Sequence, residues 1–144
     1  MSARRVWTIG YEGHSPESLI GRLRKAKIQR LVDVRELPLS RKAGFSKSSL
    51  ALGLSHASIA YTHAKPLGTP RAIRHAYKAG GSLQEFRAAY RAHLRGQKAA
   101  LAALEEQAGA QRCVLLCVEA DAEACHRHVL AEILRARGWE AIHL

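Results

Sequence analysis

Residues 112–118 read Arg-Cys-Val-Leu-Leu-Cys-Val, and they carry the clearest information on how the chain folds. The run is nearly all apolar and lacks the alternation of a strand that has one face in water. It therefore predicts a strand that is buried on both faces, as at the centre of parallel sheets that helices cover on both sides.

The flanking segments extend this prediction to the whole chain. Short β-prone runs alternate with segments whose apolar residues recur at helical spacing, which is typical of a mainly parallel sheet. We therefore predict an α/β fold with helices on both faces of the sheet, and a single domain over residues 1–144. Strands are expected at 6–9, 31–35, 58–63, 112–118 and 139–144.

Local signals mark the helices and loops between these strands. The run Ser82-Leu83-Gln84-Glu85 matches the capping-box pattern, and the apolar spacing after it predicts one long helix over residues 82–109. Residues 39–47 are polar and basic and contain glycine, and residues 65–81 contain glycine, proline and basic residues, so both segments are predicted to be loops at the rim of a site. Further helix caps are expected at Ser15, Ser46 and Asp121.

The composition is that of a globular protein, because 47% of the 144 residues are hydrophobic and 24% are charged. No apolar run is long enough for a transmembrane helix, and the first residues lack the pattern of a signal peptide. We expect a cytoplasmic location and no membrane partner. The three cysteines are an odd number without paired spacing, so we expect no disulfide.

The net charge favours anionic partners. Lys and Arg total 23 against 12 acidic residues, which gives a formal net charge of +11. Such an excess attracts nucleic acid or phosphate-bearing small molecules, although a basic surface that only serves solubility has the same charge. The sequence leaves both the cofactor and the oligomeric state open.

Polar residues gather where the predicted strands end. Tyr11 follows the first strand, and Glu119 follows the buried one. Asp33 and Arg35 share one face near the end of the second strand. Because α/β proteins bind ligands beyond the carboxyl ends of their strands, we predict one polar pocket there. The start of the next helix adds Cys125, His126 and Arg127.

Arginines in this region predict that the pocket binds an anion. Guanidinium groups bind phosphate oxygens in a bidentate manner, so Arg35, Arg41 and Arg127 are predicted to hold the ligand, together with Tyr11. The leading hypothesis is an enzyme that acts on a phosphate-bearing or nucleic-acid-related ligand. The alternative is a non-catalytic nucleic-acid-binding module that uses the basic charge.

Carboxylates supply the predicted acid or base groups, and these are Glu119 and Asp33. A structural ion pair between Asp33 and Arg35 is the alternative for that strand. A further hypothesis is thiol chemistry, with Cys125 as nucleophile and His126 as its base. The alternative is that Cys125 is a free cysteine that packs in the core at helical spacing. The spacing of Cys and His residues matches no zinc pattern, so no metal site is predicted.

The motifs of the chain, taken in order, resemble those of the domain of unknown function 488 family over essentially the whole sequence. The resemblance implies a compact α/β fold and a shared polar site at the motif positions, and it implies no reaction. The motifs are Thr8-Ile9-Gly10-Tyr11-Glu12-Gly13, Asp33-Val34-Arg35 with Pro38, Ser40-Arg41, Gly44-Phe45-Ser46-Lys47, Tyr61-Thr62-His63, Leu67-Gly68 with Pro70, and Leu116-Cys117-Val118-Glu119 leading to Cys125-His126-Arg127.

Overall fold

The computed structural model describes residues 4–119 and 126–144. This part of the chain forms one sheet of five parallel strands in the order β3-β2-β4-β1-β5, so the predicted α/β fold is confirmed. Each described helix is too short or too polar to span a membrane. The strands are β1 (Arg5–Gly10), β2 (Arg30–Asp33), β3 (Ala60–His63), β4 (Cys113–Cys117) and β5 (Glu140–His143). The helices are α1 (Pro16–Lys25), α2 (Lys47–His56), the 3-10 turn η1 (Lys65–Leu67), α3 (Arg71–Lys78), α4 (Leu83–Arg95), α5 (Lys98–Ala110) and α6 (Arg127–Ala136).

Strand β4 lies at the centre of the sheet, as its apolar sequence predicts. All of its residues are buried, and it pairs with β1 on one side and with β2 on the other. Successive side chains point to opposite faces, so Leu115 joins one hydrophobic cluster and Leu116 joins the other. Burial on both faces explains why the strand shows no polar alternation.

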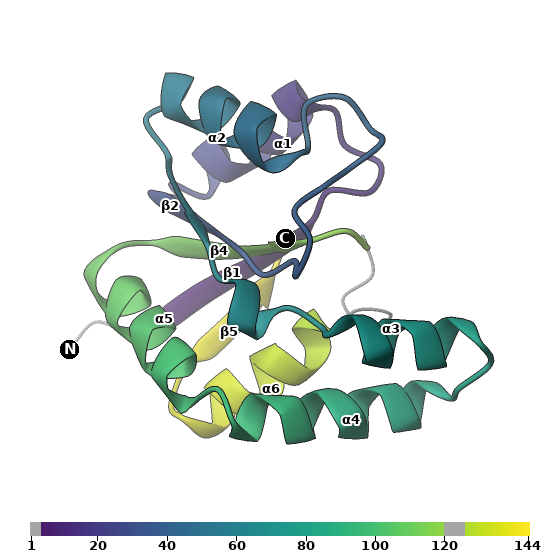
Figure 1. The fold of residues 1–144 in the computed structure, drawn as a ribbon. Helices are drawn as coiled ribbons and strands as arrows, with labels where there is room; N and C mark the ends of the chain where they lie inside the picture. The colour runs from purple at the N-terminus through teal and green to yellow at the C-terminus, as the bar shows by residue number, and fades with distance from the viewer. Residues whose placement is uncertain (1–3, 120–125) are drawn as a thin grey trace.

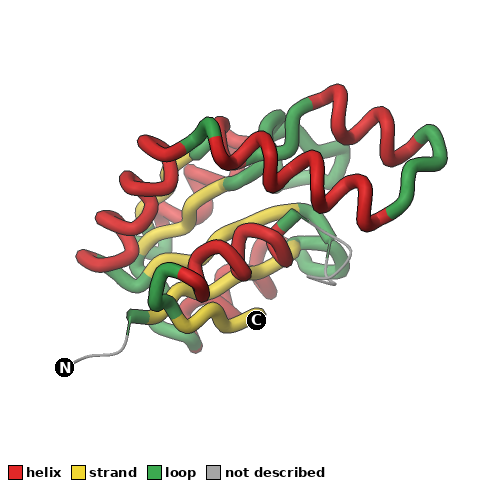
Figure 2. Tube along the Cα trace, turned by 90° about the horizontal axis from the view of Figure 1, so that it is seen from below, coloured by secondary structure: helices red, strands yellow, loops and turns green. Residues whose placement is uncertain are grey.

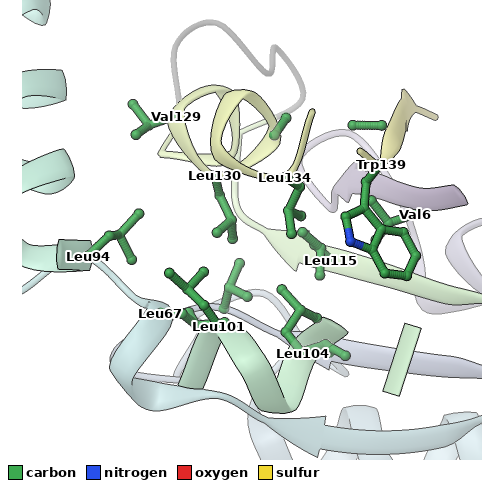
Figure 3. Close-up of a cluster of buried hydrophobic side chains, with 14 of the residues drawn as sticks. Val6, Leu67, Leu94, Leu101, Leu104, Leu115, Val129, Leu130, Leu134 and Trp139 are labelled. Carbon is green, nitrogen blue, oxygen red and sulfur yellow. The ribbon is translucent and has the colours of Figure 1, made fainter. Parts of the chain in front are cut away.

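Helices cover both faces of the sheet (Figure 1). α1 and α2 lie over one face, and α4, α5 and α6 lie over the other. Figure 3 shows the hydrophobic cluster on the second face, where Leu104 of α5 and Leu134 of α6 lie near Leu115 of β4. The two clusters bury the apolar side chains of one sheet from both sides, which is the layer arrangement expected of an α/β fold.

The predicted helix starts at Ser15 and Ser82 are confirmed. Ser15 Oγ accepts a hydrogen bond from the N–H of Ser18 at 3.0 Å, and Ser18 Oγ accepts one from the N–H of Ser15 at 2.9 Å. Ser82 Oγ accepts a hydrogen bond from the N–H of Glu85 at 3.0 Å. Ser46 precedes α2 as predicted, but its hydroxyl makes no hydrogen bond to the first turn of that helix.

Two segments differ from the prediction. The helix expected over residues 82–109 is two helices, α4 and α5, which separate at Gly96 and Gln97, and glycine is a weak helix former. The loop expected over residues 65–81 contains η1 and α3. No residue of α3 is fully buried, and this short helix lies between Pro70 and the glycines at 80 and 81, which favour a loop when only the sequence is read. The predicted cap Asp121 lies outside the described residues.

Helices α3 and α4 form an antiparallel pair that extends past the carboxyl ends of the strands (Figures 1 and 2). Tyr77 of α3 lies against Phe86 of α4, with ring centroids 4.9 Å apart. The aromatic contact holds α3 against α4 although α3 contributes no fully buried side chain to the core. The pair therefore forms a wall beside the carboxyl edge of the sheet.

Candidate functional site

A cavity of about 420 Å³ opens at the carboxyl ends of β2 and β4. Arg35 and Glu36 line it just after β2, Glu119 lines it just after β4, and His126 lines it at the start of α6. Residues of α3 and α4 complete the wall. A cavity of this volume is in the range that holds small molecules.

The course of the chain explains why the cavity forms at this edge. β2 leads into α2 on one face of the sheet, whereas the next described element after β4 is α6 on the other face. Neighbouring strands whose connections leave on opposite faces open a crevice between their carboxyl ends, and ligands of open α/β sheets bind there. The cavity thus lies at the strand ends where the sequence predicts a pocket.

A buried ion pair between Asp33 and Arg35 forms the floor of the cavity. Arg35 Nε donates to Asp33 Oδ1 at 2.8 Å and Nη2 donates to Oδ2 at 2.7 Å, while Nη1 donates to the carbonyl of Phe45 at 2.8 Å. Tyr61 adds a 2.6 Å hydrogen bond from its hydroxyl to Asp33 Oδ2. Asp33 is completely buried, so its carboxylate serves the ion pair and only Arg35 reaches the cavity.

The positive charge of Arg35 is stabilised by its contact with Asp33. Burial alone would lower the pKa of its guanidinium, but the hydrogen bonds and negative charge of Asp33 outweigh burial and raise it. Burial raises the pKa of the Tyr61 hydroxyl, and its bond to Asp33 adds to this effect. The guanidinium at the floor therefore stays positively charged at neutral pH, and the Tyr61 hydroxyl keeps its proton.

Tyr11 lies behind this ion pair and is not among the residues that line the cavity. Its ring stacks on Phe45 with centroids 4.5 Å apart, and the guanidinium of Arg35 lies 5.4 Å from its centroid. Its hydroxyl donates to Ser40 Oγ at 3.1 Å. The structure thus places this predicted ligand-binding residue as a support for Arg35 and for the loop after β2.

His126 lines the cavity but is nearly buried, with 8% of its surface exposed. Its Nε2 lies 2.7 Å from the carbonyl oxygen of Val34, so Nε2 carries the proton and donates it. The ring meets Tyr90 edge-on, with centroids 5.3 Å apart. Burial lowers the pKa of His126 to about 4; the hydrogen bond to Val34 opposes this effect in part, and the nearby positive charge of Arg127 adds a smaller lowering. The imidazole is therefore neutral at physiological pH.

Arg127 is fully buried and is not among the residues that line the cavity. Nη1 donates to Thr8 Oγ1 at 2.8 Å, and Nη2 donates to the carbonyl oxygen of Glu119 at 2.7 Å. Nε lies 2.9 Å from the sulfur of Cys117, which is disulfide-bonded, and this corrects the expectation of no disulfide. Arg127 thus joins the ends of β1 and β4 beneath the cavity.

The other three predicted site residues differ from one another in their relation to the cavity. Glu119 is half-buried and lines the cavity. Arg41 is exposed in the loop after β2 and is not among the lining residues. Cys125, the predicted nucleophile, lies outside the described residues. Cys113 is a free thiol inside β4, and burial raises its pKa to about 11.

Thr69 is a lining residue that sequence reasoning missed. It is 4% exposed, and its buried Oγ1 has no hydrogen-bond partner in the described part of the chain. The preceding Gly68 allows the chain to pass close to the segment that follows β2, because a Cβ there would lie 2.3 Å from the backbone nitrogen of Glu36. No local signal reveals this contact, which joins two segments distant in sequence.

Cations of α3 also line the cavity. Arg74 Nη1 lies 2.8 Å from Glu36 Oε1 and also donates to the carbonyl oxygen of Thr69. Lys78 follows one turn later and is exposed. The sequence predicts Arg74 only as part of a basic loop, because α3 was not expected there. Among the described residues, no group of three or more His, Cys, Asp or Glu residues is arranged to hold a metal ion.

Residues 15–134 of the chain match the family described as Domain of unknown function DUF488. Comparisons with curated proteins and with solved structures found no match. The matched segment includes every residue named above that lines the cavity, and it covers most of the 144 residues.

Proposed function

The chain belongs to the DUF488 family, whose description names no reaction, and we propose that its cavity binds a phosphate-bearing ligand of the nucleotide class and acts on it as an enzyme. Support comes from the lining of the cavity, from one buried hydroxyl and from the placement of one carboxylate.

The lining suits a ligand that combines an apolar ring with an anionic group. Tyr77 and Phe86 offer aromatic surface, and Leu37 and Leu39 of the loop after β2 are 54% and 71% exposed. Large apolar side chains at the mouth of a cavity favour a ligand that covers them. A nucleotide base meets this requirement because every base has a π-face that stacks on aromatic rings.

Positive charge beside the apolar surface supports a phosphate group. Arg74 and Lys78 lie one turn apart on α3, and Arg35 reaches the cavity from its floor. Glu36 partly neutralises Arg74, and Asp33 neutralises Arg35, so Lys78 is the cation with the most freedom to meet a ligand. Arg41 remains a proposed outer contact because its loop borders the cavity.

The hydroxyl of Thr69 is the observation that carries the proposal. A buried hydroxyl without a hydrogen-bond partner destabilises a protein by roughly 1 to 3 kcal/mol. Thr69 Oγ1 is in this condition within the wall of the cavity, next to the guanidinium of Arg74. A phosphate or ribose oxygen that binds there would satisfy the hydroxyl and recover that free energy.

Glu119 is the proposed proton-transfer residue. Asp33 is held by Arg35 and Tyr61 under the floor, and His126 has a pKa of about 4 because it is buried, so both are poorly suited to take a proton from a ligand. Glu119 lines the cavity with a half-buried side chain. Arg127 acts as a positioning residue, because it holds the backbone carbonyl of Glu119 at 2.7 Å.

Calorimetric titration tests the binding part of the proposal. We expect AMP to bind more tightly than adenosine or inorganic phosphate, because only AMP fills both parts of the cavity. Lys78→Gln should weaken AMP binding about threefold to tenfold, whereas Lys25→Gln on the distant α1 should not. Wild-type protein that binds AMP no better than it binds phosphate would contradict the proposal.

The enzymatic part has a separate test. Conversion of AMP is followed by phosphorus NMR with the wild type and with Glu119→Gln. We expect conversion by the wild type and its loss in the variant, while AMP affinity stays equal or rises because a like charge is removed. If AMP remains intact with the wild type, the proposed catalytic role of the cavity is wrong. The proposed binding of AMP is then judged by calorimetry alone.

The second candidate is a non-catalytic nucleic-acid-binding module. The net charge of +11 favours it, and Arg41 and Lys42 of the loop after β2 are exposed together with Lys47 at the start of α2. This candidate predicts that a single-stranded oligonucleotide binds with a steep dependence on salt and that Glu119→Gln leaves the affinity unchanged. Weak binding at physiological salt, with no loss in an Arg41→Gln and Lys42→Gln double variant, would exclude it.

A further inference from the structure

A second cavity, of about 660 Å³, lies at the amino-terminal edge of the sheet, opposite to the candidate site. Arg5 opens β1, Arg112 directly precedes β4, and Trp139 directly precedes β5. Gln29, just before β2, and the last residues of α5 complete the lining. We call this space the amino-edge cavity.

Two of its cations are held against tryptophan rings. The guanidinium of Arg112 lies 4.2 Å from the ring centroid of Trp7, and that of Arg4 lies 5.5 Å from the centroid of Trp139. Arg112 is fixed further, because its Nη2 donates to the carbonyl oxygen of Ala26 at 2.8 Å. Such contacts hold the positive groups in place before a ligand arrives, which lowers the entropy lost on binding.

The charge of the amino-edge cavity is positive. Arg4, Arg5 and Arg112 line it, and no Asp or Glu is among the described residues that do so. Glu140 pairs with Arg5 at 3.4 Å, but both side chains are more than half exposed, so water weakens this pair. The carboxyl end of α5 adds only a partial negative charge. Two guanidinium charges therefore remain without a carboxylate beside them in the described lining.

A buried donor in the wall also lacks a partner. Trp139 is 5% exposed, and its indole Nε1 has no hydrogen-bond acceptor within the described part of the chain. Figure 3 places this side chain at the margin of the hydrophobic cluster beside Val6. A buried N–H without an acceptor is rare and is a position where a bound oxygen improves the free energy.

We propose that the amino-edge cavity is a second binding site, which takes a small molecule bearing an oxyanion, either a phosphate or a carboxylate. The guanidinium groups of Arg4 and Arg112 would face the oxyanion, since planar guanidinium groups match both kinds of oxygen pair. The site lies at the opposite edge of the sheet from Thr69 and Glu119, and it does not depend on the function proposed for their cavity.

Tryptophan fluorescence tests this site selectively. The chain contains 2 tryptophans, Trp7 and Trp139, and both line the amino-edge cavity, whereas neither lines the candidate site. The probes are pyrophosphate and citrate, each added at constant ionic strength with sodium chloride as the reference. We expect a saturable change in emission with at least one probe, and the probe that produces it identifies the source of the oxyanion. A change no larger than that caused by chloride would overturn the proposal.

Variants decide whether the arginines carry the signal. Arg4→Gln and Arg112→Gln should each raise the probe concentration at half-saturation by about fivefold or more. Arg22→Gln, an exposed arginine on α1, is the matched control and should leave it unchanged, as should Lys78→Gln in the other cavity. Equal responses from all four variants would contradict the assignment. Arg112 also donates a hydrogen bond to the carbonyl oxygen of Ala26, so unfolding in urea is used to check that Arg112→Gln is folded. If Arg112→Gln is not folded, Arg4→Gln alone decides the test.

Discussion

Asp33 and Arg35 form a buried bidentate ion pair at the end of β2, with Arg35 Nη2 at 2.7 Å from Asp33 Oδ2. The two side chains are 0% and 4% exposed. The pair places one guanidinium at the floor of the cavity and holds the turn after β2, because Arg35 also bonds the carbonyl of Phe45. A charge pair with this degree of burial is costly to break, because the remaining charge would be buried without a partner.

Asp33→Ala should lower the free energy of unfolding by about 3 to 5 kcal/mol, because it leaves a buried guanidinium without its carboxylate. Tyr61→Phe is the matched control, since it removes one hydrogen bond to Asp33 and keeps the pair, and it should cost about 1 kcal/mol. Urea unfolding followed by circular dichroism measures both. Similar small losses in the two variants would show that the pair does not hold the turn.

His126 predicts a loss of stability in acid. The ring has a pKa of about 4 in the folded protein because it is buried, below its ordinary value of 6.5, so the unfolded chain binds more protons between these pH values. The contribution of His126 is therefore complete above pH 6.5 and declines as the pH falls toward 4. At about 1.4 kcal/mol per pKa unit, unfolding at pH 4.5 should be easier by roughly 2 to 3 kcal/mol from this group.

His126→Gln isolates that effect from other titrating groups. Glutamine can still donate to the carbonyl of Val34 but does not titrate, so the variant should lose less stability than the wild type between pH 7 and pH 4.5. The comparison uses urea unfolding at the two pH values. If wild type and variant lose the same amount, the imidazole does not have the lowered pKa.

Gly68→Ala should damage the turn beside the cavity. The backbone at Gly68 has φ −76°, which any residue adopts, so the cost comes from its added Cβ, 2.3 Å from Glu36 N. We expect a loss of roughly 1 to 3 kcal/mol in urea and weaker AMP binding. Gly109→Ala is the control, because Gly109 lies in α5 and a Cβ there meets nothing within 4 Å. Alanine is a better helix former than glycine, so this variant should raise the free energy of unfolding by roughly 0.5 to 1 kcal/mol. A neutral Gly68→Ala would mean that the two segments are not in close contact.

The sequence predicted those parts of the fold that depend on local patterns. The apolar run of β4 and the cap at Ser15 each depend on residues that are adjacent in the sequence. The structure confirms both the parallel sheet and the start of α1. α3 escaped prediction because it packs through Tyr77 on one neighbouring helix and buries no residue fully. A short helix that follows a proline and precedes two glycines resembles a loop when only the sequence is read.

The site was predictable in location but not in detail. Residues that follow strands could be placed at one edge, since parallel strands bring their carboxyl ends together, and Glu119, Arg35 and His126 do line one cavity. The depth of each side chain depends on contacts between distant segments. For this reason sequence reasoning could not tell that Asp33 and Arg127 lie beneath the surface, or that Thr69 lies in the wall.

The central claim is that Thr69 Oγ1 meets a ligand, and calorimetric titration of Thr69→Val with AMP tests it most directly. Valine has nearly the same shape, and the hydroxyl has no partner within the described chain, so the variant should unfold at the same or a higher urea concentration. AMP affinity should fall about fivefold to tenfold. Thr62→Val, which removes a 2.6 Å bond from Arg30 and does not line the cavity, should instead lower stability and keep AMP affinity. Unchanged AMP affinity in Thr69→Val would contradict the account.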